Sequence, residues 1–291
     1  MKDVVDVALV QFAPTTLDPI ANREAMIAAV RRIAREHPAD LVVFPELATT
    51  GYPPPDHDAW YGRLLARAAE PVPGPTTEAL CTVAAQTGAH VATGIAELRP
   101  GGDLANALVL VTPAGRIVVH RKVHLFGTEA HYFVPGDRLS VADTDLGRIG
   151  LSVCYDSKFP EAARSQALAG AEILVCVFAY ADDPAAPLDL LTHRAVVRAW
   201  ENQVHFVAVN RLGEEYGVRY VGRSVAADPS GRILTRGHGA EDPVVRARLT
   251  RRALTEVRRG PADRRPDVYG DPAPAVVVQA RTPPHPGRES A

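Results

Sequence analysis

Residues 148–164 read RIGLSVCYDSKFPEAAR, and this stretch decides the fold. Residues 148–155 form an apolar, strand-like run, and a turn then leads into a helical pattern over about 160–169. The alternation continues downstream with a strand over 171–178, a helix over 188–202, a strand over 205–210 and a hairpin over 224–234. Strands that alternate with helices in this way predict an α/β domain.

The chain upstream of this stretch adds further strands and helices, and some of these strands are expected to pair antiparallel. Its predicted elements are strands over 4–11 and 41–44, helices over 22–36 and 76–87, and strand-like runs over 91–98, 107–112 and 116–126. The segment 45–56 holds three consecutive prolines, which exclude regular structure and predict a loop. Because glycine and proline between the later runs indicate hairpins, we expect a mixed sheet or a pair of sheets.

The domain organisation follows from composition along the chain. No linker of shifted composition divides residues 1–270, so we expect them to form one domain. Residues 271–291 hold several prolines and no clear period. This Pro-rich segment predicts a C-terminal tail that is either disordered or lies on a partner.

Composition also excludes several classes of protein. Of 291 residues, 46% are apolar and 23% are charged, which is ordinary for a globular protein. The net charge of −2 offers no basic field to nucleic acid or to a membrane surface. Since the chain has no apolar run of transmembrane length and no N-terminal pattern of a secretory leader, we expect a cytoplasmic protein with neither nucleic acid nor membrane as a partner.

Cysteine and lysine are both scarce. The three cysteines stand at wide spacings, which support neither a disulfide framework nor a CxxC metal site. Of 32 lysines and arginines, only Lys2, Lys122 and Lys158 are lysines. Because an ammonium is a compact donor with a tunable pKa, whereas a guanidinium is a permanently charged fork, we expect a lysine here to be required as lysine.

Three apolar strands end in side chains that can take part in catalysis: Glu46 after LVVFP, Lys122 after RIVVHR and Cys154 after IGLSV. The strand ends of an α/β sheet line up at one edge, where functional sites gather. A free thiol titrates near about 8.5, and a neighbouring ammonium lowers that value while a carboxylate can take the proton. We therefore predict that these residues converge as a cysteine nucleophile with its helpers.

The same segments resemble, in order, the three catalytic blocks of the nitrilase superfamily of carbon-nitrogen hydrolases. The blocks are FPELATTGY around Glu46, HRKVHLFGTE around Lys122 and SVCYDSKFPEAAR around Cys154. Further matches within about residues 1–270 are Arg198-Ala-Trp-Glu201-Asn202, Asn210-Arg211-x-Gly213, Gly222-Arg-Ser224, Asp228-Pro-x-Gly231 and Arg265-Pro-Asp-Val-Tyr269.

The resemblance implies a four-layer αββα sandwich in a single domain, assembled as a homodimer or higher homo-oligomer. It implies Cys154 as nucleophile, Glu46 as base, and Lys122 with the backbone N–H of Tyr155 as oxyanion donors. Glu129 matches a second glutamate of the family that orients Lys122 or the substrate. Ammonia or an amine leaves, a thioester on Cys154 is hydrolysed, and neither cofactor nor metal is implied.

The implied chemistry leaves the substrate open among small amides, N-carbamoyl compounds and nitriles, of which amides are the commoner in the family. The position of Lys158 often meets the far end of the substrate in relatives, which favours an anionic acyl chain; the alternative is a solvated surface lysine. Tyr52, Trp60 and Tyr180 are candidates for the pocket wall, or for packing alone. Residues 179–182 depart from the family's usual proline followed by small and aromatic residues, so no relative's substrate can be assumed.

Other protein classes fit less well. A cysteine thioesterase of the α/β-hydrolase type needs a second glycine that GLSVCYD lacks. A non-catalytic amide-binding or scaffold protein on the same fold would normally have lost Glu46, Lys122 or Cys154, and all three are present.

Several residues near the blocks also have structural interpretations. Cys81 and Cys176 fit small apolar core residues, and Asp156 fits a residue that holds the turn after Cys154. The spacing of His120, His124 and His131 could suggest a metal site, but on a strand it does not favour converging ligands.

Overall fold

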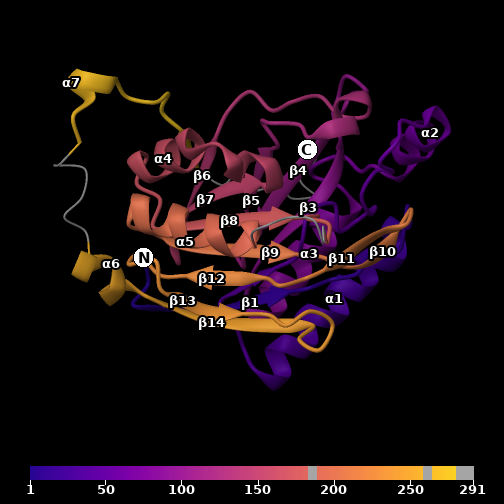
Figure 1. The fold of residues 1–291 in the computed structure, drawn as a ribbon. Helices are drawn as coiled ribbons and strands as arrows, with labels where there is room; N and C mark the ends of the chain where they lie inside the picture. Colours follow the sequence, from indigo (N-terminus) through magenta and orange to yellow (C-terminus); the bar gives the residue numbers. More distant parts are fainter. Residues whose placement is uncertain (183–188, 258–263, 280–291) are drawn as a thin grey trace, which may run out of the picture.

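Two large sheets lie at the centre of the molecule, a computed structural model that describes residues 1–182, 189–257 and 264–279 (Figure 1). The six-stranded sheet has the order β14 (Val244–Thr250), β1 (Val4–Val10), β2 (Leu41–Val43), β3 (His90–Leu98), β4 (Leu104–Val111) and β5 (Ile117–Arg121). The seven-stranded sheet has the order β13 (Ile233–Arg236), β12 (Val225–Ala227), β9 (His205–Asn210), β8 (Ile173–Phe178), β7 (Gly147–Val153), β6 (Ser140–Thr144) and β15 (Val276–Gln279). A separate hairpin consists of β10 (Leu212–Glu215) and β11 (Val218–Val221).

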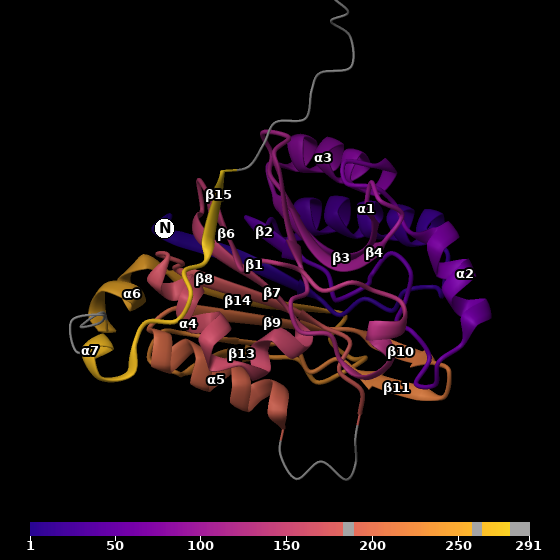
Figure 2. The same cartoon turned by 90° about the horizontal axis from the view of Figure 1, so that it is seen from above.

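Helices cover the outer face of each sheet (Figure 2). α1 (Pro19–Glu36) and α3 (Pro75–Thr87) pack on the six-stranded sheet, and α4 (Pro160–Leu168) and α5 (Leu190–Asn202) pack on the seven-stranded sheet. The shorter helices are α2 (Ala59–Ala68), η1 (Gly127–His131), η2 (Cys154–Lys158), α6 (Arg251–Val257) and α7 (Pro266–Tyr269). The order helix, sheet, sheet, helix confirms the predicted αββα sandwich and the single α/β domain.

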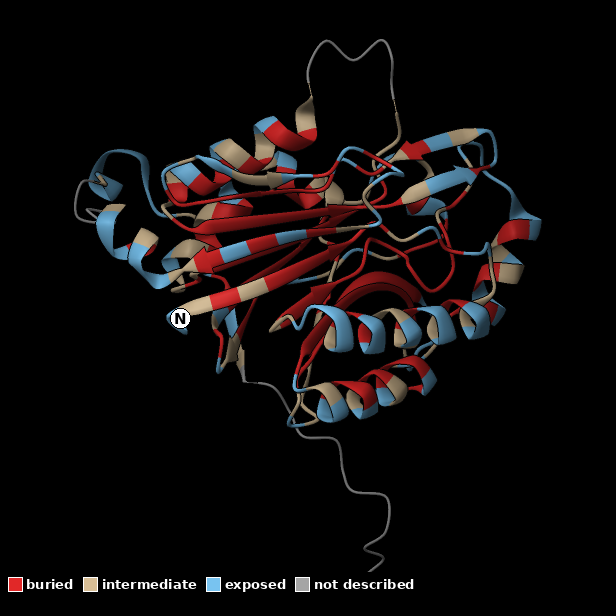
Figure 3. Ribbon diagram, turned by 90° about the horizontal axis from the view of Figure 1, so that it is seen from below, coloured by how far each residue is buried: buried red, intermediate tan, exposed pale blue. Residues whose placement is uncertain are grey.

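The covering helices are made by local signals and one apolar face. In α1, Asp18 caps the first turn with its side chain and Pro19 occupies the first helical position. Met26, Val30 and Ile33 recur at helical spacing and are buried against the sheet. Burying each such side chain contributes roughly 1.5 to 3 kcal/mol. Figure 3 shows the same division, with these helices buried along one side and exposed along the other.

The main core lies between the two sheets. It is formed by apolar side chains from both, including Leu9, Val43 and Leu108 from one sheet and Ile149, Val175 and Val207 from the other. β8 pairs in parallel with both β7 and β9, so the carboxyl ends of these three strands meet at one edge. Cys154 is the first residue beyond β7 and therefore lies at that edge.

Two strands end earlier than their apolar runs predicted. The run 116–126 leaves the sheet after Arg121, and the run 148–155 leaves it after Val153. The backbone N–H groups of Val123 and His124 bond to a side chain instead of a neighbouring strand. These two extensions of the predicted strands were therefore wrong.

Several elements had no clear signal in the sequence, notably α2, β6, β14 and the β10–β11 hairpin. β14 reads VVRARLT and pairs antiparallel with β1. Its two arginines are exposed and interrupt the apolar run, so no clear strand signal is present in the sequence here. In the C-terminal segment, β15 pairs in parallel with β6 of the same chain, so the expectation of a tail that is disordered or lies on a partner was wrong for residues 276–279. Residues 280–291 and the predicted start of a helix at 188 lie outside the described residues.

Within the described ranges, every helix is too short or too polar to cross a lipid bilayer.

Candidate active site

Glu46 lies in the loop that follows β2 and passes over β3. The N–H of Gly94 on β3 donates to the carbonyl of Pro45 at 3.0 Å. A Cβ atom at residue 94 would lie 2.5 Å from the Cα of Glu46 and 2.4 Å from the N of Leu47, closer than such atoms can approach. The absence of a side chain at Gly94 therefore allows Glu46 to be fully buried at this point.

Lys122 follows β5 and joins two buried carboxylates. Its ammonium donates to Glu46 Oε1 at 2.7 Å and to Glu129 Oε1 at 2.6 Å. All three side chains are fully buried. Burial acts to lower the pKa of Lys122, but the negative charges of Glu46, Cys154 and Glu129 raise that pKa by more, so the group stays an ammonium.

The Glu46 carboxylate has two further donors that sequence reasoning missed. Asn106 on β4 donates through Nδ2 to Oε1 at 2.7 Å, and the backbone N–H of Ala179, just after β8, donates to Oε2 at 2.7 Å. Asn106 is the single polar residue in the apolar strand LANALVLV, and that isolation is the signal that could have identified it. Oε1 thus accepts from both Lys122 and Asn106.

Cys154 begins η2 in a left-handed backbone conformation, with φ of +44°, which is uncommon for a residue that has a side chain. The residue is partly exposed. Burial of the thiol, together with Glu46 and Glu129, raises the pKa of Cys154 well above its usual value, although Lys122 and Arg194 act to lower it. Lys122 thus acts in the expected direction, but burial of the thiol, helped by the two carboxylates, outweighs that lowering.

Asp156 links the segment that carries Cys154 to the segment that carries Lys122. Its buried carboxylate accepts from the N–H of Val153 at 3.1 Å, and from the N–H groups of Val123 and His124 at 3.2 and 2.9 Å. The prediction that Asp156 holds the turn after the cysteine is confirmed.

Two histidine rings complete the contacts of Asp156. His120 Nε2 lies 3.1 Å from Oδ2, and His124 Nδ1 lies 2.8 Å from Oδ1. Burial acts to raise the pKa of Asp156, but the hydrogen bonds from both histidines lower that pKa well below its usual range. The third histidine of the suggested metal site, His131, lies elsewhere, with its ring 4.5 Å from that of His57. In the described part of the chain, no group of three His, Cys, Asp or Glu side chains is arranged to hold a metal ion.

Glu129 connects the site to Tyr52. The Tyr52 hydroxyl donates to Glu129 Oε1 at 2.5 Å, and the N–H of Phe126 donates to Oε2 at 2.9 Å. Burial and the charge of Glu46 raise the pKa of Glu129, although Lys122 acts to lower it. The structure therefore brings Tyr52 and Glu129 together with the three strand-end residues.

Tyr155 and Lys158 lie on η2 and contact each other. Lys158 Nζ lies 3.2 Å from the Tyr155 hydroxyl and 5.1 Å from the centre of its ring. The Tyr155 ring packs edge-on against Phe159 and lies 5.1 Å from the ring of Phe126. The Lys158 side chain itself is exposed.

Tyr180 follows Ala179, and its backbone is fixed by one side chain. Asn210 accepts from the Tyr180 N–H at 2.8 Å and donates to the Tyr180 carbonyl at 3.0 Å. This pair of bonds steadies the chain next to the Ala179 N–H that contacts Glu46. Trp60, by contrast, is 61% exposed on α2, so its expected place in the pocket wall is not supported.

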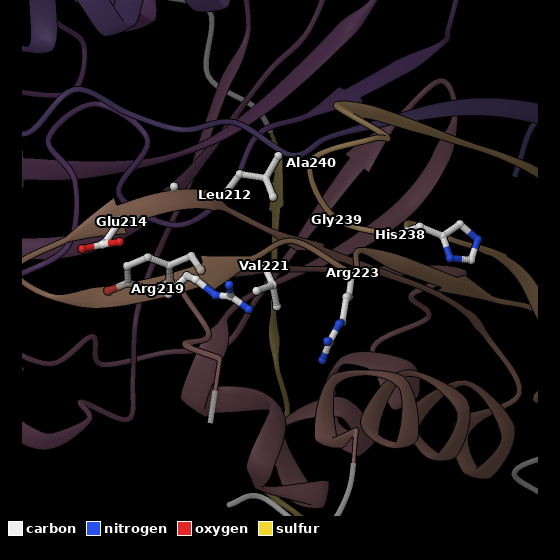
Figure 4. A pocket seen from close by; sticks show the side chains of 10 residues that line it. Leu212, Glu214, Arg219, Val221, Arg223, His238, Gly239 and Ala240 are labelled. Atoms are coloured by element: carbon white, nitrogen blue, oxygen red, sulfur yellow. The ribbon is translucent and has the colours of Figure 1, made fainter. Parts of the chain in front are cut away.

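A separate hollow of about 540 Å³ lies along the β10–β11 hairpin (Figure 4). Arg219 and Arg223 supply positive charge to its lining, and both approach Asp182, at 2.9 and 3.8 Å. Its lining includes none of the strand-end residues, and its cations already have a carboxylate partner.

Comparison with known proteins gives consistent matches. Residues 6–259 match the family described as "Carbon-nitrogen hydrolase". The chain is 36% identical over 245 residues to the nitrilase of Pyrococcus abyssi, covering 83% of this chain and 88% of that protein. It is 36% identical over 231 residues to the (R)-stereoselective amidase of a Pseudomonas species, covering 78% and 79%.

The fold matches a solved structure as well. The crystal structure of a CN-hydrolase superfamily protein from Xanthomonas campestris, with an arsenic adduct in its active site, superposes with a TM-score of 0.77. The identity is 28%, and the match covers 89% of this chain and 96% of that one.

Proposed function

This chain belongs to the carbon-nitrogen hydrolase family, and from that premise we propose that it hydrolyses the C–N bond of a small amide or N-carbamoyl compound through a thioester on Cys154. The observation that carries the proposal is the buried ammonium of Lys122, which lies between Glu46 and Glu129 and acts to lower the pKa of the Cys154 thiol. Acyl transfer through a cysteine requires such a nucleophile, a base and a donor to the developing oxyanion.

In the first step, Glu46 removes the proton from Cys154 as the sulfur attacks the carbonyl carbon. Because the pKa of the thiol is raised, the thiol starts protonated and needs the base at the moment of attack. Glu46 Oε2 takes the proton, since among the described residues it accepts only from the Ala179 N–H, whereas Oε1 accepts from both Lys122 and Asn106.

The carbonyl oxygen then becomes an oxyanion, which Lys122 and the N–H of Tyr155 stabilise. As the C–N bond breaks, the proton held by Glu46 passes to the leaving nitrogen, so ammonia or an amine departs and the thioester remains. In the second half of the reaction, Glu46 takes a proton from water as the water oxygen attacks the thioester. The C–S bond breaks, the sulfur recovers the proton, and the acid is released.

We assign supporting roles to the residues around this centre. Glu129 orients Lys122, and the hydroxyl of Tyr52 in turn fixes Glu129. Tyr52, Tyr155 and Tyr180 border the acyl part of the substrate, and Lys158, beside Tyr155, is one candidate for its far end. A homodimer, which the family resemblance implies, and a cytoplasmic location, which the sequence pattern predicts, complete the proposal.

A nitrile is the second candidate substrate. It is supported by the name of the Pyrococcus abyssi relative, whereas the name of the Pseudomonas relative supports an amide. A purely scaffolding role is disfavoured because the buried Glu46, Lys122 and Glu129 are fully engaged with one another around a cysteine.

The test is ammonia release from a matched panel of small amides, N-carbamoyl amino acids and nitriles, with the wild type and Cys154→Ala. We expect turnover of amides or carbamoyl compounds that Cys154→Ala abolishes. Turnover of nitriles alone would select the second candidate. Equal turnover by Cys154→Ala, or none of any compound by the wild type, would contradict the proposal.

A further inference from the structure

α5 presents two arginines, one helical turn apart, to the turn that carries Cys154. Arg198 donates through Nε to the carbonyl of Ser157 at 3.1 Å and through Nη2 to the carbonyl of Lys158 at 3.0 Å. Residues four apart share one face of a helix. Arg194 therefore lies on the face of α5 that packs against η2, where it is half-buried.

The topology brings Arg194 to the edge of the sheet where the reaction is proposed. Arg194 stands in the second turn of α5, the first helix after β8, and β8 is the parallel neighbour of β7. Cys154 stands at the carboxyl end of β7. In α/β sheets, ligands bind outside the carboxyl ends of the strands, which is the end from which α5 starts.

The charge of Arg194 acts at the site and has no acidic partner among the described residues. The guanidinium of Arg194 acts to lower the pKa of the Cys154 thiol, so its charge influences the sulfur. The acids on and beside α5 are already paired: Asp182 with Arg219, Asp189 with Arg236 and Glu201 with Arg198. A partly buried guanidinium is stabilised by a carboxylate that binds through two parallel hydrogen bonds. A ligand can supply such a carboxylate.

We propose that Arg194 binds a carboxylate at the end of the substrate remote from the scissile amide, and so makes the enzyme selective for anionic amides. This inference rests on the proposed function and names the substrate class of the same site. It assigns to Arg194 the role that the sequence suggested for Lys158. Lys158 is exposed and its ammonium rests on Tyr155, whereas Arg194 is half-buried on the helix face that meets η2.

The test compares glutaramate with pentanamide, which has the same chain length and lacks the carboxylate. Affinities are measured by calorimetry in the Cys154→Ala background, so the result does not depend on turnover. Arg194→Met should lower the ratio of glutaramate to pentanamide affinity by about 10- to 100-fold, the scale of a lost charge-assisted hydrogen bond. Arg194→Lys should recover part of the ratio, because it keeps the charge and loses the fork.

Two further variants serve as controls. Arg246→Met removes a positive charge from the exposed face of β14, in the other sheet, and should leave the ratio where it is. Lys158→Met tests the rival cation and should lower the ratio less than Arg194→Met does.

A ratio that Arg194→Met does not lower, including the case in which glutaramate fails to bind, overturns the assignment. A larger fall with Lys158→Met overturns it in favour of Lys158. If the ratio depends on Arg194 but the wild type releases no ammonia from any amide, the binding inference stands and the proposed hydrolysis fails.

Discussion

Two buried polar clusters share the segment 120–124, and the carboxylate takes opposite places in them. In the lysine cluster, one ammonium lies between two carboxylates: Lys122 between Glu46 and Glu129. In the aspartate cluster, one carboxylate lies between two imidazole rings: Asp156 between His120 and His124. The central group of each cluster is fully buried, yet the pKa of the acid Glu129 is raised in the first cluster and that of Asp156 is lowered in the second.

The difference lies in whether the hydrogen bonds and charges around each buried acid outweigh the effect of its burial. The lysine cluster has two acids and a thiol for one cation, and the pKa values of Glu129 and Cys154 are raised, chiefly by burial. The aspartate cluster has donors on every side of one carboxylate, and the pKa of Asp156 is lowered. An excess of acid around a buried cation prepares a group to move a proton, whereas a fully satisfied carboxylate holds backbone segments in place.

The largest effect is expected when the proposed nucleophile beside the lysine cluster is removed. Cys154→Ala should lower turnover by at least about 10⁴-fold, since the variant lacks the proposed nucleophile. The control is Cys176→Ala, a buried cysteine on β8 that packs in the core, which should remain active. Intact-mass analysis during turnover should show an acyl adduct on the wild type and none on Cys154→Ala. An adduct mapped to Cys81 or Cys176 would refute the assignment.

Changing the cation of the lysine cluster should have the next largest effect. Lys122→Arg keeps the charge but replaces a compact ammonium with a wide fork, which does not fit between Glu46 and Glu129. Turnover should fall by at least about 100-fold, the usual effect of losing one oxyanion donor. Thermal unfolding should show that the fold is retained. A variant as active as the wild type would make Lys122 a structural residue.

The aspartate cluster should show its role in stability. Asp156→Asn should lower the free energy of unfolding by about 1 to 3 kcal/mol, because an amide group would replace an acceptor that faces several donors. Denaturation in urea at pH 7 measures this loss, and Asp103→Asn, in an exposed turn, is the matched control with little expected change. An equal loss of stability in both variants would contradict a stabilising role specific to Asp156.

Comparing the wild type with Asp156→Asn at different pH values tests the cause of this stabilisation. The pKa of Asp156 is lower in the folded chain than in the unfolded one, so its stabilisation is present above the unfolded value of about 4 and is lost as pH falls below it. The wild type should therefore lose more stability than Asp156→Asn as pH falls from 5 towards 3. Parallel losses would contradict the assigned cause.

The smallest effect is expected for Asn106, whose replacement tests the proposed role of Glu46 in proton transfer. Asn106→Leu removes a donor to Glu46 Oε1, which increases the affinity of that carboxylate for protons. The acid limb of kcat/KM should move up by about one pH unit, and turnover should fall by about 10-fold. Asn106→Asp places a second carboxylate there and should move the limb further in the same direction. A uniform fall at all pH values would indicate a packing role only.

The sequence was informative where chemistry and periodicity coincide. Glu46, Lys122 and Cys154 each follow an apolar run, so their place at strand ends could be predicted from residue order alone. The structure also joins Glu129 to Lys122, as the resemblance implied.

Other features could not be read in this way. The N–H of Ala179 that binds Glu46 belongs to the backbone and leaves no mark in the sequence. The raised pKa of Cys154 depends first on how deeply the thiol is buried and then on the charges around it, which residue types alone do not give. The approach of the Glu46 loop to Gly94 likewise becomes evident only when the two segments are seen together.

The short strand β15 has a consequence for solubility. It occupies one edge of the seven-stranded sheet, where it pairs with Ser140–Asp143 of β6. An unpaired edge strand offers its N–H and C=O groups to any extended chain, and such edges promote aggregation. A chain truncated at residue 270 would keep every proposed catalytic residue and expose this edge. We therefore expect that form to aggregate at high protein concentration, because β15 in the intact chain covers an edge that could otherwise pair with other extended chains.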